Sequence, residues 1–301
     1  MDLYQELCRI LGEDNVLKDE PMSRHTTFRV GGPADLFVTP EEEGQVKKAL
    51  AAIRAAGVPF YIVGNGSNLL VGDLGYRGVI LQIYQKMNRI QIRDSVIHAQ
   101  AGALLSKIAA EAQAGALSGF EFASGIPGTL GGAVMMNAGA YGGEMKQVLI
   151  EARVLSAEGA FEDVLAEDME LGYRTSVFSR NKGLVLGASI HLEPGDPEKI
   201  RERMEELKTQ RTSKQPLEYP SAGSTFKRPE GYFAGKLIQD AGLRGFQVGG
   251  AQVSEKHCGF VINKDRASAK EIRSLMEQVS EKVYAQFGVR LEPEVKMIGE
   301  F

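Results

Sequence analysis

A short glycine motif near residue 65 could bind a phosphate group through its main chain. Val63-Gly-Asn-Gly-Ser-Asn-Leu-Leu-Val71 follows a short apolar run, and a loop of this composition exposes backbone amides. The side chains of Ser67 and Asn68 add further donors for a diphosphate. The spacing differs from the dinucleotide pattern G-x-G-x-x-G, and no helix is predicted to begin after it. A tight turn between two strands explains the same motif equally well.

A second segment, residues 124–143, has seven glycines and no charged side chain in twenty residues. Such a composition would make a poor surface loop. It is typical of main chain that packs against a large flat ligand and supplies amide donors and shape. A buried glycine-rich packing loop is the alternative, and it is less favoured because both glycine clusters occur in one chain.

Together with Arg29-Val-Gly-Gly-Pro-Ala34, these two segments resemble the FAD-binding domain of the vanillyl-alcohol-oxidase-like flavoproteins. Three later motifs resemble the UDP-N-acetylenolpyruvoylglucosamine reductase family more closely: Gly172-Tyr-Arg-Thr-Ser-Val-Phe178, Ala222-Gly-Ser-Thr-Phe-Lys-Arg-Pro229 and Leu291-Glu-Pro-Glu-Val-Lys296. With Arg211-Thr-Ser-Lys214, the match extends from about residue 24 to residue 298. Such a set of motifs in this order is highly specific.

The resemblance implies a non-covalent FAD, NADPH as reductant, and reduction of an enolpyruvyl UDP-sugar to its lactyl ether for peptidoglycan synthesis. It implies that main chain and small side chains of both glycine segments hold the flavin. The cofactor-binding positions carried over are Val63, Gly64, Asn65, Gly66, Ser67, Asn68, Ser124, Gly125, Ile126, Pro127, Gly128, Thr129, Gly132, Ala133, Asn137 and Gly139.

The resemblance also implies three catalytic residues, and each of them must meet a physical condition to perform its role. Hydride addition to the enolpyruvyl group builds negative charge, which the guanidinium of Arg174 could stabilise while it holds the carboxylate. Ser224 matches the proton donor, a role that requires a pre-positioned and polarised hydroxyl. Glu294 matches the acidic partner and would need burial to stay protonated. Alone, each residue has an ordinary surface explanation.

Local positive charge is expected for the UDP diphosphate. Lys214 and Arg228 match substrate-contacting positions of the family, whereas Arg211 and Lys227 could equally be solvated surface charges. Tyr173 is expected against the substrate because it precedes Arg174. Longer family members insert a segment whose tyrosine folds over the substrate, but here only residues 181–210 separate the arginine motif from the basic residues. The chain therefore resembles the short branch, and its lid is not identified.

The elements that must position these residues follow from periodicity and turn chemistry. Helices are predicted at 42–56 and 104–114, from Pro197 onward, and after the capping box Ser268-Ala-Lys-Glu271, with Gly288 as a C-terminal cap. Strands are predicted at 59–63, 78–83, 95–99, 148–156, 160–165 and 183–191. The order indicates an α+β fold rather than a regular βαβ repeat.

The resemblance divides the chain into a two-part FAD-binding domain and a C-terminal α/β substrate-binding domain. We expect a first flavin subdomain at 1–70, a second at 71–195, and the substrate domain at 196–301, beginning after the loop Glu193-Pro-Gly-Asp-Pro197. The tail of the substrate domain is expected to pack back toward the flavin site.

Composition limits the other function classes. The 301 residues carry a net charge of −4 without a long like-charge run, so no nucleic-acid partner is expected. No membrane segment and no secretory signal are predicted, and Cys8 and Cys258 lack the spacing of a metal or disulfide site. We therefore expect a cytoplasmic monomer that uses no metal.

Two rival functions make different predictions for this sequence. An FAD oxidase or dehydrogenase of the same superfamily would predict a covalent flavin or an unrelated C-terminal domain. A nucleotide-binding sensor without chemistry would predict loss of Arg174, Ser224 or Glu294, all of which are present.

Overall fold

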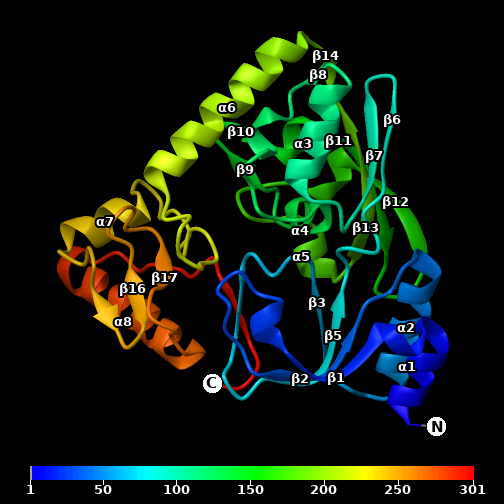
Figure 1. Ribbon diagram of the computed structural model, residues 1–301, viewed down its shortest axis with the longest axis horizontal. Coiled ribbons are helices and arrows are strands. Elements are labelled where there is room, and N and C mark those ends of the chain that lie inside the picture. The colour runs from blue at the N-terminus through cyan, green and yellow to red at the C-terminus, as the bar shows by residue number, and fades with distance from the viewer. Residues whose placement is uncertain (1) are drawn as a thin grey trace. The chain divides into compact units, whose positions relative to one another are not determined.

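The computed structural model describes residues 2–301, which form two compact units (Figure 1). Unit 1 contains the chain as far as Leu17 together with Phe37–Asn65 and Val79–Arg211, and unit 2 contains Lys18–Leu36, Gly66–Gly78 and Thr212–Phe301. Each unit has its own cluster of buried apolar side chains. The family resemblance divides the chain by function, into two flavin subdomains that meet at residue 70 and a substrate domain that begins after residue 195. That functional division stays a prediction.

Unit 1 begins with two helices that pack against each other, α1 (Leu3–Leu11) and α2 (Glu43–Ala55). The α2 helix confirms the helix predicted at 42–56, and it buries Val46, Leu50 and Ile53. A four-stranded sheet has the order β1-β2-β5-β3. Its strands are β1 (Val16–Pro21), β2 (Pro33–Val38), β5 (Tyr76–Gln82) and β3 (Phe60–Val63), and β3 runs parallel to β5. Unit 1 contains β3 and the second part of β5, whereas most of β1 and β2 lies within the residues of unit 2.

A five-stranded antiparallel sheet forms the rest of the framework of unit 1, in the order β12-β11-β13-β7-β6 (Figure 1). Helices α3 (Leu105–Ala114) and α4 (Leu130–Met135) contact it, and their apolar side chains join its core. The strands are β12 (Phe161–Leu165), β11 (Leu149–Leu155), β13 (Leu184–His191), β7 (Val96–Gln100) and β6 (Ile90–Arg93). The predicted strands of this region are confirmed.

Short elements complete unit 1. Two pairs of short antiparallel strands occur, and the long helix α6 (Pro197–Lys214) follows the second pair in the chain. Unit 1 includes α6 as far as Arg211. The remaining elements are β8 (Leu117–Ser118), β14 (Glu193–Pro194), β9 (Gly139–Ala140), β10 (Gly143–Glu144), α5 (Phe178–Asn181) and the 3-10 helices η1 (Glu13–Asn15), η3 (Glu121–Ala123), η4 (Met145–Gln147) and η5 (Ala166–Met169).

Unit 2 packs the long helix α8 (Ala269–Phe287) against a three-stranded antiparallel sheet. Ser268 and Glu271 form the predicted capping box at its start, and Gly288 ends it in a left-handed conformation. The other elements are β15 (Gln247–Val248), β16 (Ala251–Val253), β17 (Val261–Asn263), α7 (Ala234–Asp240), η2 (Met22–Arg24), β4 (Leu69–Val71) and β18 (Lys296–Ile298). The mixture of helices and antiparallel strands confirms the α+β class.

Candidate active site

The first half of the glycine motif near residue 65 belongs to unit 1 and continues from β3. The parallel pairing of β3 with β5 extends past the strand, since the amide of Ile83 donates to the Val63 carbonyl at 2.9 Å. The side chain of Gln82 then donates to the carbonyl of Gly64 at 3.1 Å. Sequence reasoning missed Gln82 because it lies 18 residues away on another strand. The loop therefore leaves the sheet in a fixed direction.

Unit 1 brings the two glycine segments together. The side chain of Asn65 donates to the carbonyl of Pro127 at 2.8 Å. A Cβ atom on Gly64 would lie 2.4 Å from the hydroxyl oxygen of Thr129, so only glycine permits this approach. Two motifs that are 62 positions apart thus form one surface of small side chains and main chain, as a shared ligand would require.

The second half of the motif belongs to unit 2. Gly66 has a φ of 62°, and a Cβ atom there would lie 1.9 Å from the carbonyl oxygen of His25. The amide of Thr27 donates to the Gly66 carbonyl at 3.2 Å. The loop is therefore pressed against residues 25–27, which no sequence pattern had connected with it.

Asn68 connects this loop with the predicted catalytic glutamate. Its side-chain nitrogen donates to the backbone carbonyl of Glu294 at 3.1 Å, and its own carbonyl accepts from Lys296 at 3.0 Å. Strands β4 and β18 continue the contact as a parallel pair. The side-chain oxygen of Asn68 is buried and has no hydrogen-bond partner among the residues described. A buried acceptor without a partner costs free energy, and a ligand that donates there would recover it.

The second glycine segment forms a compact turn and a short helix. The hydroxyl of Ser124 donates to the carbonyl of Glu121 at 2.8 Å, and α4 begins after Thr129. Gly131 is packed against Ala101, since a Cβ atom there would approach the Ala101 Cβ to 2.9 Å. The segment that looked like an irregular loop therefore contains a helix, which its paired glycines disfavour locally.

Asn137 holds the glycine segment against the arginine motif. Its side chain donates to the carbonyl of Gly172 at 3.2 Å and to the Glu144 carboxylate at 3.0 Å, and its oxygen accepts from Lys146 at 2.9 Å. Only 2% of Asn137 is exposed. These contacts give Asn137 a structural role, and its contact with the flavin stays a prediction.

Arg174 lies in a tight turn in unit 1. Gly172 and Thr175 exchange two backbone hydrogen bonds of 3.2 and 3.3 Å. Arg174 itself has a φ of 55°, a left-handed conformation that costs free energy in a non-glycine residue. Its guanidinium carbon lies 5.3 Å from the centre of the Tyr173 ring, which is 57% exposed. The turn thus presents a cation and an aromatic ring together, and the contact of both residues with substrate stays a prediction.

Ser224 and Glu294 lie on adjacent segments of unit 2. The amide of Glu294 donates to the carbonyl of Thr225 at 2.9 Å, and Lys227 donates its amide to Glu292 at 2.8 Å. Thr225 is buried, and its hydroxyl accepts from Val261 at 2.8 Å, which fixes the backbone next to Ser224. Ser224 is exposed, whereas Glu294 is only 8% exposed and so meets the condition of burial set for it.

The predicted basic residues fall in two places. Arg211, at the end of unit 1, lies against the second glycine segment, because a Cβ atom on Gly125 would be 3.1 Å from its Cδ atom. Burial lowers the pKa of Arg211 from its usual value, although the guanidinium remains charged. Its packing distinguishes Arg211 from a freely solvated surface charge.

Lys214, Lys227 and Arg228 belong to unit 2. Lys227 forms an ion pair with Glu292, and the guanidinium carbon of Arg228 lies 3.9 Å from the centre of the Phe233 ring. Their contact with substrate stays a prediction. The stretch between the arginine motif and Arg211 consists largely of β13, β14 and α6.

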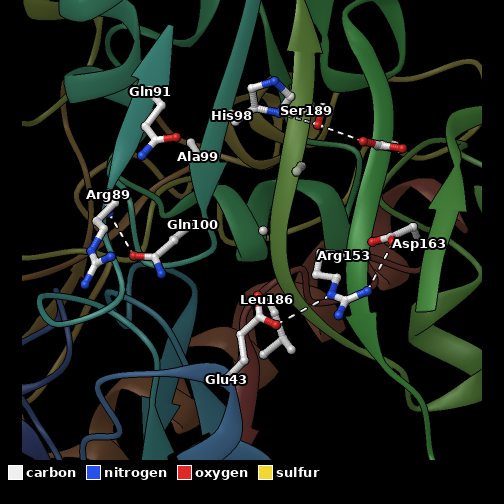
Figure 2. A pocket seen from close by; sticks show the side chains of 13 residues that line it. Glu43, Arg89, Gln91, His98, Ala99, Gln100, Arg153, Asp163, Leu186 and Ser189 are labelled. Carbon is white, nitrogen blue, oxygen red and sulfur yellow. Dashed lines mark hydrogen bonds and ion pairs between the residues drawn. The ribbon is translucent and has the colours of Figure 1, made fainter. Parts of the chain in front are cut away.

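A polar cavity of about 290 Å³ lies over the five-stranded sheet of unit 1, and none of the predicted site residues lines it (Figure 2). Arg153 contacts Asp163 at 3.1 Å and Glu43 at 3.5 Å. Ser189 bridges His98 at 2.9 Å and Glu151 at 3.0 Å. These internal pairs are typical of the solvated face of an antiparallel sheet.

The residues described contain no cluster of acidic, histidine or cysteine side chains able to hold a metal ion. Within the same residues, no helix has both the length and the apolar character needed to cross a membrane. Cys8 and Cys258 are both free thiols.

Two family models match the chain. The model for the C-terminal domain of UDP-N-acetylenolpyruvoylglucosamine reductase matches residues 215–298. The model for an FAD binding domain matches residues 34–164. The first model includes Ser224 and Glu294, and the second includes both glycine segments.

Individual proteins agree with this assignment. UDP-N-acetylenolpyruvoylglucosamine reductase of Agathobacter rectalis is 53% identical over 298 residues, with 95% of each chain covered. The crystal structure of UDP-N-acetylenolpyruvylglucosamine reductase from Thermus caldophilus superimposes with a TM-score of 0.81 at 35% identity and covers 93% of this chain and 98% of its own. Phl p 4.0202, a glucose dehydrogenase, superimposes with a TM-score of 0.50 at 13% identity over 65% of this chain and 45% of its own, which shows a shared fold alone.

Proposed function

Because the chain belongs to the UDP-N-acetylenolpyruvoylglucosamine reductase family, we infer that it is an FAD-containing, NADPH-dependent reductase. Its substrate is UDP-N-acetylglucosamine enolpyruvate and its product is UDP-N-acetylmuramate, a precursor of peptidoglycan. This conclusion rests on the identity of about half of all residues with curated reductases of this family, over nearly the full length of the chain. The fold combines a flavin-binding domain of the vanillyl-alcohol-oxidase-like type with a C-terminal substrate domain.

The residues of the glycine segments suit a flavin. Side chains are excluded at Gly64 and Gly66, where an added Cβ atom would meet Thr129 or His25. The partnerless oxygen of Asn68 is a polar atom that a ligand could satisfy. We propose that these segments hold FAD through backbone amides and small side chains. When bound, FAD supplies the hydride carrier between NADPH and substrate.

We propose that Arg174 binds the carboxylate of the enolpyruvyl group and stabilises the charge that develops during reduction. A guanidinium is charged at any relevant pH and can bind a carboxylate through two parallel hydrogen bonds. The left-handed backbone of Arg174 and its constrained turn support this role, because such strained residues cluster at functional sites.

We propose that Ser224 donates the proton that completes the product and that Glu294 assists it. A serine hydroxyl is a weak acid, so its position must be fixed and its proton polarised by neighbours. The anchoring of Thr225 and the hydrogen bond from Glu294 to Thr225 supply that rigidity. Glu294 is buried beside this segment, with only 8% of the residue exposed, so it is shielded from bulk solvent.

We propose that Tyr173, Arg211, Lys214, Lys227 and Arg228 contact the nucleotide sugar, with the cations near its diphosphate. The packing of Arg211 against the glycine segment and its lowered pKa support a partly desolvated binding group. The match of residues 215–298 to the reductase C-terminal domain favours this substrate over that of another oxidase or dehydrogenase. The free thiols of Cys8 and Cys258 suit a reducing compartment, so we propose a cytoplasmic enzyme, and a monomer remains our prediction.

The assignment predicts two separable colour changes. The purified protein is expected to be yellow and to release its flavin on acid precipitation. Under anaerobic conditions NADPH should bleach it, and the enolpyruvyl UDP-sugar should restore the colour, because reduction of the substrate reoxidises the cofactor. Absorbance spectroscopy of the flavin measures both steps.

A flavin that stays reduced after addition of this sugar would exclude the reductase assignment but not the flavin site. The matched control is UDP-N-acetylglucosamine, which lacks the enolpyruvyl double bond and should leave the flavin reduced.

A further inference from the structure

Unit 2 contains a cavity of about 520 Å³ that is rich in positive charge and includes none of the proposed catalytic or substrate-binding residues. It uses Arg29, from the upstream motif Arg29-Val-Gly-Gly-Pro-Ala34, to which no role has been assigned. The lining residues that matter here are Arg29, Asp73, Tyr219, Asn263, Lys264 and Arg266.

Asn263 builds the cavity by joining two distant segments. Its side chain donates to the carbonyl of Phe28 at 3.0 Å and accepts from the amide of Ala267 at 2.7 Å. It is only 9% exposed, and the first of these bonds spans 235 positions. The neighbours of both partners are arginines, so this buried amide fixes Arg29 and Arg266 on the same cavity.

The two arginines are held in unusual backbone conformations without an internal partner. Arg29 has a φ of 57° and Arg266 a φ of 53°, a left-handed conformation that costs free energy in a non-glycine residue. Over the described residues, neither guanidinium makes a hydrogen bond or ion pair. Their charges therefore remain available to a ligand, in contrast to Arg153 in the cavity of Figure 2, which contacts two carboxylates.

The one carboxylate that lines the cavity is already used. Asp73 accepts from the amides of Ala269 at 2.8 Å and Lys270 at 2.9 Å, at the start of α8. Lys264 adds a third cation, which donates to the side-chain oxygen of Gln252 at 3.0 Å and forms an ion pair with Glu255 at 3.9 Å, so the two arginines carry the unpaired charge. Three positive side chains thus face the cavity against one negative side chain whose oxygens are occupied.

We propose that this cavity is a second anion site that binds a diphosphate-bearing small molecule. The guanidinium groups of both arginines supply planar donors that match phosphate oxygens. The volume lies within the range of small-molecule sites, which is roughly 300–1,000 Å³. The exposed ring of Tyr219 offers a surface for an organic group attached to the diphosphate.

The site lies along the segment that leads to Ser224. Asn263 donates its amide to the carbonyl of Pro220 at 2.9 Å, and Ser221 bridges Ile262. A ligand held by Arg29 and Arg266 would therefore bind next to the backbone that supports the proposed proton donor. Binding at this site does not depend on the reductase assignment and is measured without turnover.

Isothermal titration calorimetry of the flavin-loaded protein with inorganic pyrophosphate at low ionic strength tests the proposal. We expect saturable binding that weakens at least about tenfold, or about 1.4 kcal/mol, in the double variant Arg29→Gln/Arg266→Gln. Arg29→Asn, whose side chain tolerates a left-handed backbone, should weaken it in the same direction if the double variant folds poorly. Thermal unfolding and flavin absorbance report whether the variants are folded.

A control variant separates this site from general attraction, and occupancy of the substrate group by product separates it from that group. Arg290→Gln removes an exposed cation that stacks on Tyr284 elsewhere in unit 2, and it should bind pyrophosphate like the parent protein. Saturating UDP-N-acetylmuramate occupies the proposed substrate cations, so pyrophosphate binding and its tenfold weakening in the double variant should persist in its presence. Absence of binding to the parent, equal weakening in Arg290→Gln, or loss of pyrophosphate binding in the presence of UDP-N-acetylmuramate would overturn the proposal.

Discussion

Replacement of Ser224 by alanine is expected to leave the reduction of the flavin by NADPH unchanged and to slow formation of UDP-N-acetylmuramate by about 10²–10⁴-fold. The magnitude is that of a positioned acid or base in other enzymes. The hydroxyl has no part in hydride transfer from NADPH, whereas the second half-reaction needs a proton at the carbon next to the carboxylate. Anaerobic stopped-flow absorbance measures the two half-reactions separately.

Ser221→Ala is the matched control, because Ser221 lies on the same segment and contributes a backbone bridge to Ile262 rather than a proposed proton. It should leave both half-reactions near the parent rates. Equal slowing of both half-reactions by Ser224→Ala would point to a structural role for this serine and contradict its assignment as proton donor.

Replacement of Gly66 by alanine is expected to abolish retention of FAD. The added Cβ atom would lie 1.9 Å from the carbonyl oxygen of His25, and backbone at both positions would have to move. Movement of Gly66 would displace Ser67 and Asn68 and weaken the pairing of β4 with β18. The ratio of flavin to protein absorbance after gel filtration measures retention.

Gly57→Ala separates this contact from the cost of the backbone conformation. Gly57 has a φ of 66°, close to that of Gly66, but an added Cβ atom there would have no neighbouring atom within 4 Å. Both variants carry a left-handed alanine, at a cost of about 1–2 kcal/mol. A Gly66→Ala protein that retains FAD as well as Gly57→Ala does would rule out the proposed role of this close approach.

The elements whose signals are local could be predicted from the sequence. Ser268 and Glu271 are three residues apart and define the start of α8, and Gly288 defines its end. The spacing of Val46, Leu50 and Ile53 likewise identifies α2. In each case the residues that determine the element lie within it or beside it, so periodicity and capping rules suffice.

The contacts that assemble the site could not be predicted because they join distant parts of the chain. The hydrogen bond from Asn68 to Glu294 spans 226 positions, and neither residue carries a local sign of the other. Helix α4 was missed because Gly131 and Gly132 have low helix propensity, and tertiary contacts with Ala101 and Ala103 override that preference. The residue types were predictable, but their supporting partners were not.

The parallel pairing of β4 with β18 has a consequence for the order of events during biosynthesis. Strand β4 is translated in the first quarter of the chain, whereas β18 is translated after every other helix and strand. The loop at Asn68 therefore lacks its partner while the ribosome is still adding unit 2. We expect nascent chains that end before residue 296 to bind FAD poorly even when the five-stranded sheet has formed, so that cofactor loading follows translation.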